Sequence, residues 1–227
     1  MDKFAIHESW YDSIYDILDD IKFTKPTCNG SISEVACVFD IESTSFYFND
    51  EKRATMYAWV FGINGKCIRG RTWDEFIQVC NILQQEYELN EKKRLIVYVH
   101  NLAYEFQFFK DRFHWINNFS LEERKPIYAL CDLGIEFRCS YILSGYSLEK
   151  VGEHLTKYKV NKLVGDLNYN LPRHSKTPLT NEEWNYILHD GLVVMAYIQE
   201  EIERMKGIKK IPLTKTGHVR TLCRNAC

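Results

Sequence analysis

The chain has 227 residues, enough for one domain with a short appendage. Hydrophobic residues make up 45%, charged residues 26% and aromatic residues 14%, which is a globular but unusually aromatic composition. The net charge of −2 excludes a large non-specific duplex-DNA binder, which needs a strong basic surplus, and still allows an enzyme that grips a few nucleotides.

The eight cysteines form no CxxC pair and have no cluster of histidines beside them, which argues against a zinc site. The start of the chain is polar and acidic and lacks the pattern of a secretory signal. We therefore expect free thiols and a cytoplasmic protein. No apolar run is long enough to span a membrane, so no membrane partner is expected.

Apolar side chains recur every three or four residues over 5–21, which predicts an amphipathic helix. Pro26, Asn29 and Gly30 then interrupt the pattern. Residues 1–30 are therefore expected to form an N-terminal helical appendage.

Residues 31–206 alternate between strand and helix patterns, and residues 156–179 look irregular. Asn64-Gly65 is a strong hairpin signal, and Thr180 with Glu183 forms a capping box at the start of a long helix. The predicted strands are 34–41, 56–63, 66–70, 94–99, 127–131 and 135–140; the predicted helices are 73–88, 102–113, 147–155 and 180–205. This order predicts an α/β fold in which helices cover both faces of a mixed sheet.

Residues 207–227 contain several basic side chains and no acid. This basic tail is compatible with the remnant of a linker, with a strap that contacts DNA, or with a solvated C-terminus. Its basic residues include Lys209, Lys210, Lys215, Arg220 and Arg224.

Two carboxylates stand at the end of the first buried strand. Asp40 and Glu42 are two positions apart, so in a strand both side chains point to the same face. Close carboxylates repel unless a cation lies between them, and Mg²⁺ favours such oxygen donors. The pair alone is weak evidence, but α/β sites form at this end of a buried strand.

The segment His100-Asn101-Leu102-Ala103-Tyr104-Glu105 follows the second buried strand and opens a predicted helix. Asn101 suits the N-cap, and Glu105 would face either the sheet edge or the solvent one turn later. The aromatic residues around them suit a hydrophobic core or the stacking of unpaired bases. These aromatic residues are Tyr98, Tyr104, Phe106, Phe108 and Phe109.

Tyr186 and Asp190 lie one turn apart in the long predicted helix and therefore share a face. A single pair of this kind would have no meaning on a surface helix. Combined with the two preceding segments, it completes a set of four acids with a tyrosine beside the last. Such a set suits phosphodiester hydrolysis with two metal ions, in which a tyrosine hydroxyl orients the attacking water.

Three segments, FDIES, VHNLAYEFQFF and YILHD, resemble the motifs of the DEDD 3′–5′ exonucleases of the Tyr subclass. The segments HNLAYEF, LVGDLNY, TPLTNEE and TKTGHVR are similar to the exonuclease domain of protein-primed family B DNA polymerases of phages and linear plasmids. The resemblance covers about residues 34–220. It implies an RNase H-like α/β fold with a mixed five-stranded sheet flanked by helices.

The resemblance also implies roles for the acids. Asp40, Glu42 and Asp190 would ligate two Mg²⁺ or Mn²⁺ ions, and Tyr186 would orient the water. Glu105 stands where many relatives have Asp, so it would reach the metal directly or through a water.

Further residues are implied to hold the single-stranded 3′ end of DNA. They are Ser43, Tyr98, His100, Asn101, Tyr104, Phe108, Ser140 and Tyr169. One position departs from some relatives, which have a catalytic Lys where this chain has Val164. We expect Lys162 to substitute for it if this stretch is extended.

The implied activity is 3′–5′ proofreading of single-stranded DNA, in a host cytoplasm if a phage encodes the chain. The sequence contains no second acidic constellation for a polymerase domain. The chain is therefore expected to be an isolated exonuclease module, a truncated product or the partner of a separate polymerase chain. Two alternatives stay open: a non-catalytic module that binds single strands or a polymerase, and an exonuclease that acts on RNA, because no residue named above detects a 2′-OH.

Overall fold

A single mixed sheet passes through the centre of the molecule. The computed structural model describes residues 4–18, 20–123, 125–160 and 171–226. The strands are β1 Ser31–Ile32, β2 Cys37–Phe48, β3 Glu51–Ile63, β4 Lys66–Gly70, β5 Lys93–Val99, β6 Trp115–Glu122, β7 Lys125–Cys131 and β8 Ile135–Cys139. The helices are α1 Ile14–Ile17, α2 Trp73–Glu86, α3 Leu102–Phe109, α4 Ser140–Ser144, α5 Leu148–His154, α6 Asn181–Met205, the 3₁₀ turn η1 Ile208–Lys210 and α7 Lys215–Ala226.

The strand order is β4-β3-β2-β5-β8-β7-β6, and β1 adds to β5. Strands β2, β5 and β8 run parallel to one another, whereas β3, β4, β6 and β7 are antiparallel to their neighbours. The mixed α/β fold is therefore confirmed. The sheet has eight strands rather than five, because β1, β6 and β7 extend the five strands β4-β3-β2-β5-β8.

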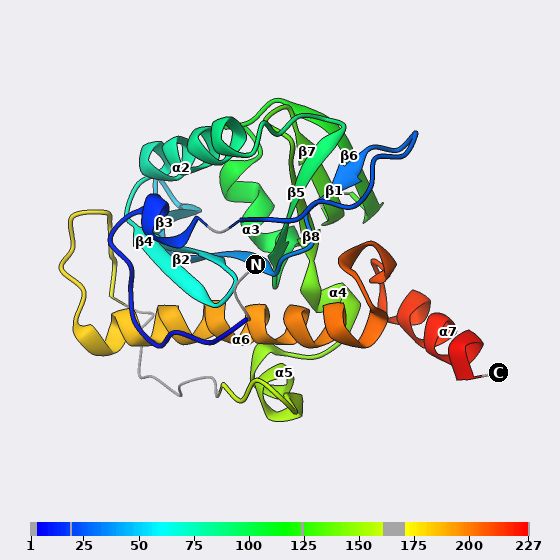
Figure 1. Ribbon diagram of the computed structural model, residues 1–227. Helices are drawn as coiled ribbons and strands as arrows, with labels where there is room; N and C mark the ends of the chain where they lie inside the picture. The colour runs from blue at the N-terminus through cyan, green and yellow to red at the C-terminus, as the bar shows by residue number, and fades with distance from the viewer. Residues whose placement is uncertain (1–3, 19, 124, 161–170, 227) are drawn as a thin grey trace.

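Helices cover both faces of the sheet (Figure 1). Side chains of α2 and α3 form one apolar core with Phe39 of β2, and side chains of α5 and α6 form a second core with its neighbour Val38. Because alternate residues of a strand point to opposite faces, β2 contributes to both cores. The molecule has three layers, and β2 lies in the middle one.

Two strong sequence patterns have the predicted structure. Asn64 and Gly65 both have positive φ, 52° and 92°, and they join β3 to β4 as a tight hairpin. Thr180 caps α6, since its hydroxyl accepts from the backbone N–H of Glu183 while the Glu183 carboxylate accepts from the N–H of Thr180. The irregular segment before α6 is described only from residue 171 onward.

The helix predicted over residues 5–21 is wrong for most of that range, because among its described residues only α1, Ile14–Ile17, is helical. The preceding segment is extended along β4: the N–H of His7 donates to the carbonyl of Gly65, and that of Tyr11 donates to Cys67. An exposed edge strand offers unpaired backbone groups, and the N-terminal segment satisfies them. Ile14 and Ile17 are buried in the core of the domain, so this part of the appendage packs against the sheet.

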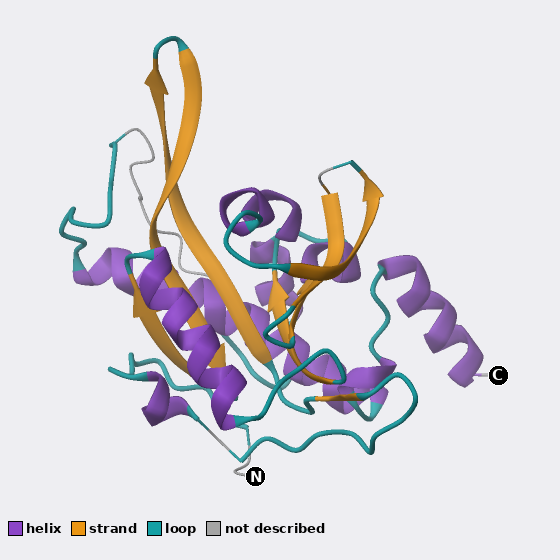
Figure 2. Ribbon diagram, turned by 90° about the horizontal axis from the view of Figure 1, so that it is seen from above, coloured by secondary structure: helices purple, strands orange, loops and turns teal. Residues whose placement is uncertain are grey.

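Strands β2 and β3 are longer than predicted. They continue beyond the sheet as a hairpin that projects from the body of the molecule (Figure 2). The turn residues Asn49 and Asp50 have φ of 50° and 63°, as a two-residue hairpin turn of type I′ requires. Strand β6 was not predicted, because its exposed apolar residues do not alternate and its pairing with β7 is irregular.

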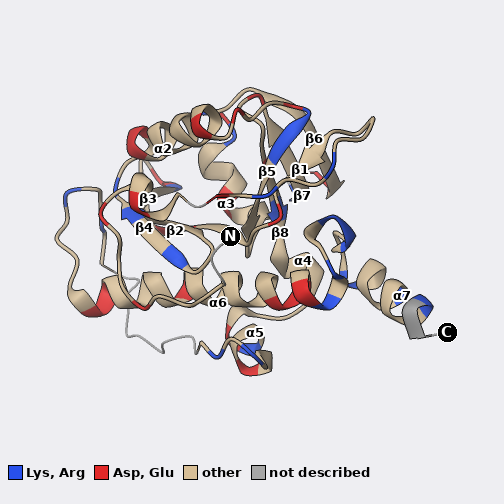
Figure 3. Ribbon diagram, in the orientation of Figure 1, with Lys and Arg blue, Asp and Glu red and all other residues tan. Residues whose placement is uncertain are grey.

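The basic tail is folded rather than extended. Ile208 and Ile211 are buried, and α7 follows them. The Nε2 atom of His218 on α7 lies 2.9 Å from the carboxylate of Glu201 on α6, which is 1% exposed. Several Lys and Arg residues lie in the segment after α6, which is partly blue in Figure 3. The contact between the two helices fixes α7 against the domain.

Candidate metal centre and its groove

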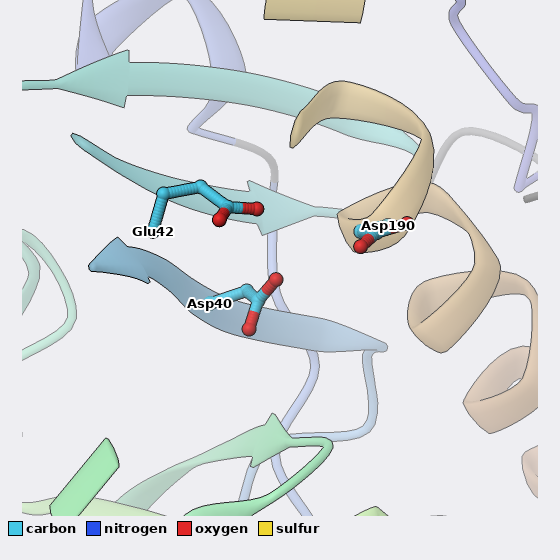
Figure 4. A group of neighbouring side chains, drawn as sticks. All are labelled: Asp40, Glu42 and Asp190. Atoms are coloured by element: carbon cyan, nitrogen blue, oxygen red, sulfur yellow. The ribbon is translucent and has the colours of Figure 1, made fainter. Parts of the chain in front are cut away.

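Three carboxylates meet between β2 and α6. Asp40, Glu42 and Asp190 each present one oxygen, and these oxygens all lie within 4.8 Å of one another (Figure 4). Glu42 is 8% exposed and Asp190 is 5% exposed. The structure thus brings together three of the acids predicted as metal ligands, and their role as ligands stays a prediction.

Their placement on β2 differs in one respect from the prediction. The strand does not end at Ile41, so Asp40 and Glu42 lie within it. Strand β5 ends at Val99, however, and it pairs with β2 only at Val38. The two acids therefore lie beyond the end of the neighbouring parallel strand, where α/β folds commonly form sites.

Close packing of α6 on β3 brings Asp190 to this position. Val60 is the cross-strand partner of Asp40. Gly191 lies against Val60 so closely that a Cβ at position 191 would be 3.2 Å from a Val60 methyl carbon. Ile187 and Leu188 bury the apolar side of the helix. The absence of a side chain at Gly191 thus lets the helix approach the strand that faces Asp40.

Glu105 lies beside the cluster but is not part of the set of three. It is 3% exposed on α3, and its pKa is raised well above the ordinary value by burial, by the charge of Asp40 and by a hydrogen bond with Asp40. Its buried Oε2 has no hydrogen-bond partner among the described residues. A carboxylate in this position would be stabilised by a nearby cation.

Tyr186 lies on α6 one turn before Asp190, as predicted, and it is 7% exposed. Tyrosine and aspartate four residues apart on a helix are neighbours on the same face. The role of the hydroxyl in orienting water stays a prediction.

An open groove of about 270 Å³ adjoins the cluster; its lining is Ile41, Glu42, Ser43, Ser45 and Tyr104. The hydroxyls of Ser43 and Tyr104 are 2.5 Å apart, and the rings of Tyr104 and Phe108 have centroids 5.2 Å apart. Three of the residues predicted to contact DNA are therefore together beside the acids. Ser45 was missed, because the strand was expected to end before it.

The structure places other predicted DNA contacts differently. Tyr98 is 2% exposed in the core, where burial raises the pKa of its hydroxyl, and Ser140 is fully buried. Neither side chain is accessible to a DNA strand in this structure, which goes against the direct contacts predicted for them. The hydroxyl of Ser140 lies 3.1 Å from Nδ1 of His100, so it positions that ring, which is partly exposed. Asn101 is exposed at the start of α3.

Two predictions, Lys162 and Tyr169, lie outside the described residues. No statement about their side chains follows from the structure. Their assignments stay predictions that rest on the sequence alone.

The donor set at this centre fits a hard divalent cation. All its ligating atoms are carboxylate oxygens, which Mg²⁺ and Mn²⁺ prefer over softer ligands. Glu105 supplies a further buried oxygen close by. The fold and the centre define an α/β domain with an acidic, metal-compatible cluster at an open groove.

A comparison with protein-family models gives no match, and no curated protein sequence matches the chain. Among solved structures, the chain is similar to Phi29 DNA polymerase. In a complex with primer-template DNA and incoming nucleotides, the TM-score is 0.59 at 16% identity over 75% of this chain. In an orthorhombic crystal form, the TM-score is 0.59 at 15% identity over 80% of this chain. With single-stranded DNA, it is 0.55 at 16% identity over 75% of this chain.

The chain spans about a third of the length of these polymerase structures, with 31% or 32% of each covered. The match confirms the predicted fold, and it agrees with the predicted resemblance to the exonuclease domain of protein-primed polymerases. No helix within the described part of the chain is long and apolar enough to cross a membrane.

Proposed function

We propose that the chain is a metal-dependent 3′–5′ exonuclease that removes nucleotides from single-stranded 3′ ends of DNA and proofreads for a DNA polymerase. The observation that carries the proposal is the meeting of Asp40, Glu42 and Asp190 at an open groove. The likeness of the fold to Phi29 DNA polymerase, one structure of which holds single-stranded DNA, supports it.

Asp40, Glu42 and Asp190 would hold two divalent ions, with Glu105 reaching them directly or through a water. When bound, the ions would neutralise charge on the phosphodiester and make hydroxide available near neutral pH. We expect Mg²⁺ to be the ion, and we expect Mn²⁺ to support the reaction in its place.

The remaining residues would bind and orient the strand. The rings of Tyr104 and Phe108 offer apolar surface to the terminal base, and the paired hydroxyls of Ser43 and Tyr104 offer hydrogen bonds to its sugar or phosphate. The hydroxyl of Tyr186 would orient the attacking water. Lys162 would substitute for the catalytic lysine of some relatives. If Lys162→Ala hydrolysed single strands at the wild-type rate, this role would be wrong.

The test is hydrolysis of a 5′-labelled single-stranded DNA oligonucleotide with Mg²⁺ or Mn²⁺. The wild type should give a ladder that shortens from the 3′ end, and Asp40→Ala/Glu42→Ala should give none. The matched control is Glu122→Ala/Glu123→Ala, which removes two adjacent exposed acids at the β6–β7 turn and should retain full activity.

Two outcomes would redirect the proposal. Binding of the oligonucleotide without any metal-dependent degradation would indicate a non-catalytic single-strand or polymerase-binding module. Faster degradation of an RNA oligonucleotide of the same sequence would indicate an RNA-directed exonuclease.

A further inference from the structure

The projecting hairpin is continuous with the groove beside the acids. Strand β2 carries Asp40 and Glu42 at its base and continues to the exposed tip, with a shift in its register against β3 between Glu42 and Ser43 (Figure 2). Its last residues are aromatic: Phe46 is 37% exposed, Tyr47 is 75% exposed and Phe48 is 52% exposed. Three consecutive exposed rings on a thin two-stranded arm bury little in the fold, so packing does not explain them.

The two faces of the arm differ, because residues directly opposite each other in an antiparallel pair share a face. Ser45 pairs with Ala54, and Tyr47 pairs with Lys52. This face continues the row of groove residues, since Ser43 and Ser45 line the groove and alternate residues of a strand point the same way. Tyr47 and Lys52 therefore lie on the same side of the arm as the groove residues Ser43 and Ser45. We name the surface formed by Ser45, Tyr47, Lys52 and Ala54 the tyrosine face.

On the opposite face of the arm, the side chains contact one another. Phe46 pairs with Arg53, and Phe48 pairs with Glu51. The Arg53 guanidinium lies 5.0 Å from the centroid of the Phe48 ring and 3.0 Å from the Glu51 carboxylate. This phenylalanine face thus combines a cation–π contact with an ion pair, in which Arg53 compensates the charge of Glu51.

We propose that the tyrosine face of the β2–β3 hairpin is a second binding surface for the single strand, on which Tyr47 stacks with an upstream base and Lys52 contacts a phosphate. The inference rests on the proposed function for the polarity of the strand, whose 3′ end would lie at the acids. Tyr47 is four residues beyond the groove residue Ser43, about 13 Å along an extended strand, so it would meet nucleotides upstream of the terminal one.

The chemistry of this face selects the ligand. An exposed aromatic ring stacks with any base, and an adjacent lysine offers a positive charge to the phosphodiester, which is the combination used by sequence-tolerant single-strand binders. A duplex has no unpaired base to offer Tyr47. A single-stranded nucleic acid is therefore the occupant that matches both side chains.

The first experiment measures equilibrium binding of a fluorescent single-stranded DNA of about 16 nucleotides, the upper site size of single-strand-binding folds, in EDTA so that no hydrolysis occurs. Tyr47→Ala/Lys52→Ala should bind about 10-fold to 100-fold more weakly than the wild type. Tyr47→Phe, which keeps the ring, should bind like the wild type. The matched control is Phe48→Ala/Arg53→Ala on the phenylalanine face, which should lose little affinity.

The second experiment compares this oligonucleotide with a trinucleotide as a substrate for hydrolysis. The double variant of the tyrosine face should raise KM for the long strand alone, and it should leave kcat and the hydrolysis of the trinucleotide unchanged. Equal unfolding midpoints for all variants would establish that the hairpin mutations act on binding.

The outcomes separate the two proposals. Loss of binding in the tyrosine-face variant alone supports the second surface even if the wild type hydrolyses nothing. Wild-type hydrolysis and binding of the long strand by that variant overturn the second surface and leave the exonuclease standing. Equal losses in both double variants also overturn it, because the effect would then not depend on the face.

Discussion

Glu105 and Glu136 are both 3% exposed, yet their neighbours have opposite charges. Glu136 on β8 accepts from Arg94 at 2.6 Å and from Arg138 at 2.7 Å. Glu105 faces Asp40, and burial together with that charge raises its pKa. Burial alone therefore does not distinguish a structural carboxylate from one suited to a cation, whereas the sign of the neighbouring charge does.

The largest expected effect on stability comes from Glu136, the carboxylate of the pair that has basic neighbours. Glu136→Ala leaves Arg138, whose side chain is 12% exposed, without its carboxylate, so we expect a loss of about 3–5 kcal/mol in the free energy of unfolding. Urea denaturation measures it. The control Glu51→Ala removes an exposed partner of Arg53 and should cost less than about 1 kcal/mol. Equal losses in the two variants would contradict the comparison.

The second prediction concerns the acidic cluster beside Glu105, where binding of a metal ion should stabilise the folded protein. With Mg²⁺ at about 100 times its Kd, the free energy of unfolding of the wild type should rise by about 2.7 kcal/mol. Asp190→Asn should lose most of this gain, and in EDTA it should be at least as stable as the wild type, because it relieves repulsion among three close carboxylates. Thermal unfolding with and without EDTA tests this; an equal gain from Mg²⁺ in both proteins would contradict it.

Glu105→Gln should lower the hydrolysis of single-stranded DNA without lowering the unfolding midpoint. It keeps the size of the side chain and removes the charge facing Asp40, so the variant should unfold in EDTA at or above the wild-type midpoint. Hydrolysis of single-stranded DNA should fall by about 10-fold to 100-fold, as for groups that support a metal centre. Full hydrolysis with a lowered midpoint would assign Glu105 the structural role of Glu136.

The smallest effect concerns an exposed carboxylate. Partial burial acts to raise the pKa of Glu203, but hydrogen bonds from Lys157, Tyr158 and Gln199 lower it to about 2. A lowered pKa means that its stabilisation is complete above the pKa of the unfolded chain and is lost as the pH falls toward 2. Glu203→Gln should therefore destabilise at pH 7 by less than about 1 kcal/mol and not at pH 2. A difference that persisted at pH 2 would refute this origin.

Much of the centre could be predicted from local patterns. Asp40 and Glu42 share a face because of strand alternation, and Tyr186 and Asp190 share one because of the helical repeat. The capping box at Thr180 and Glu183 marked the start of the helix that carries the last acid. Short-range rules were sufficient for these residues.

Other features depend on contacts between distant segments. The N-terminal apolar residues have helical spacing, yet backbone pairing with β4 makes that segment extended. Tyr98 and Ser140 carry groups that can contact DNA, but tertiary packing buries both. The hairpin was missed because the Asn49-Asp50 turn was not recognised, although Asn and Asp readily adopt its positive φ.

The close approach of Gly191 to Val60 limits how much change the metal centre can tolerate. A methyl group at position 191 would force Val60 or the helix to move by a few tenths of an ångström. Asp190 precedes Gly191 on the helix and Asp40 lies opposite Val60, so either movement alters the spacing of these two carboxylates. A residue without a side chain thus sets the spacing of the acidic cluster, on which the proposed binding of an ion would depend. We expect Gly191→Ala to alter the preference for one ion radius over another more than it lowers the stability of the fold.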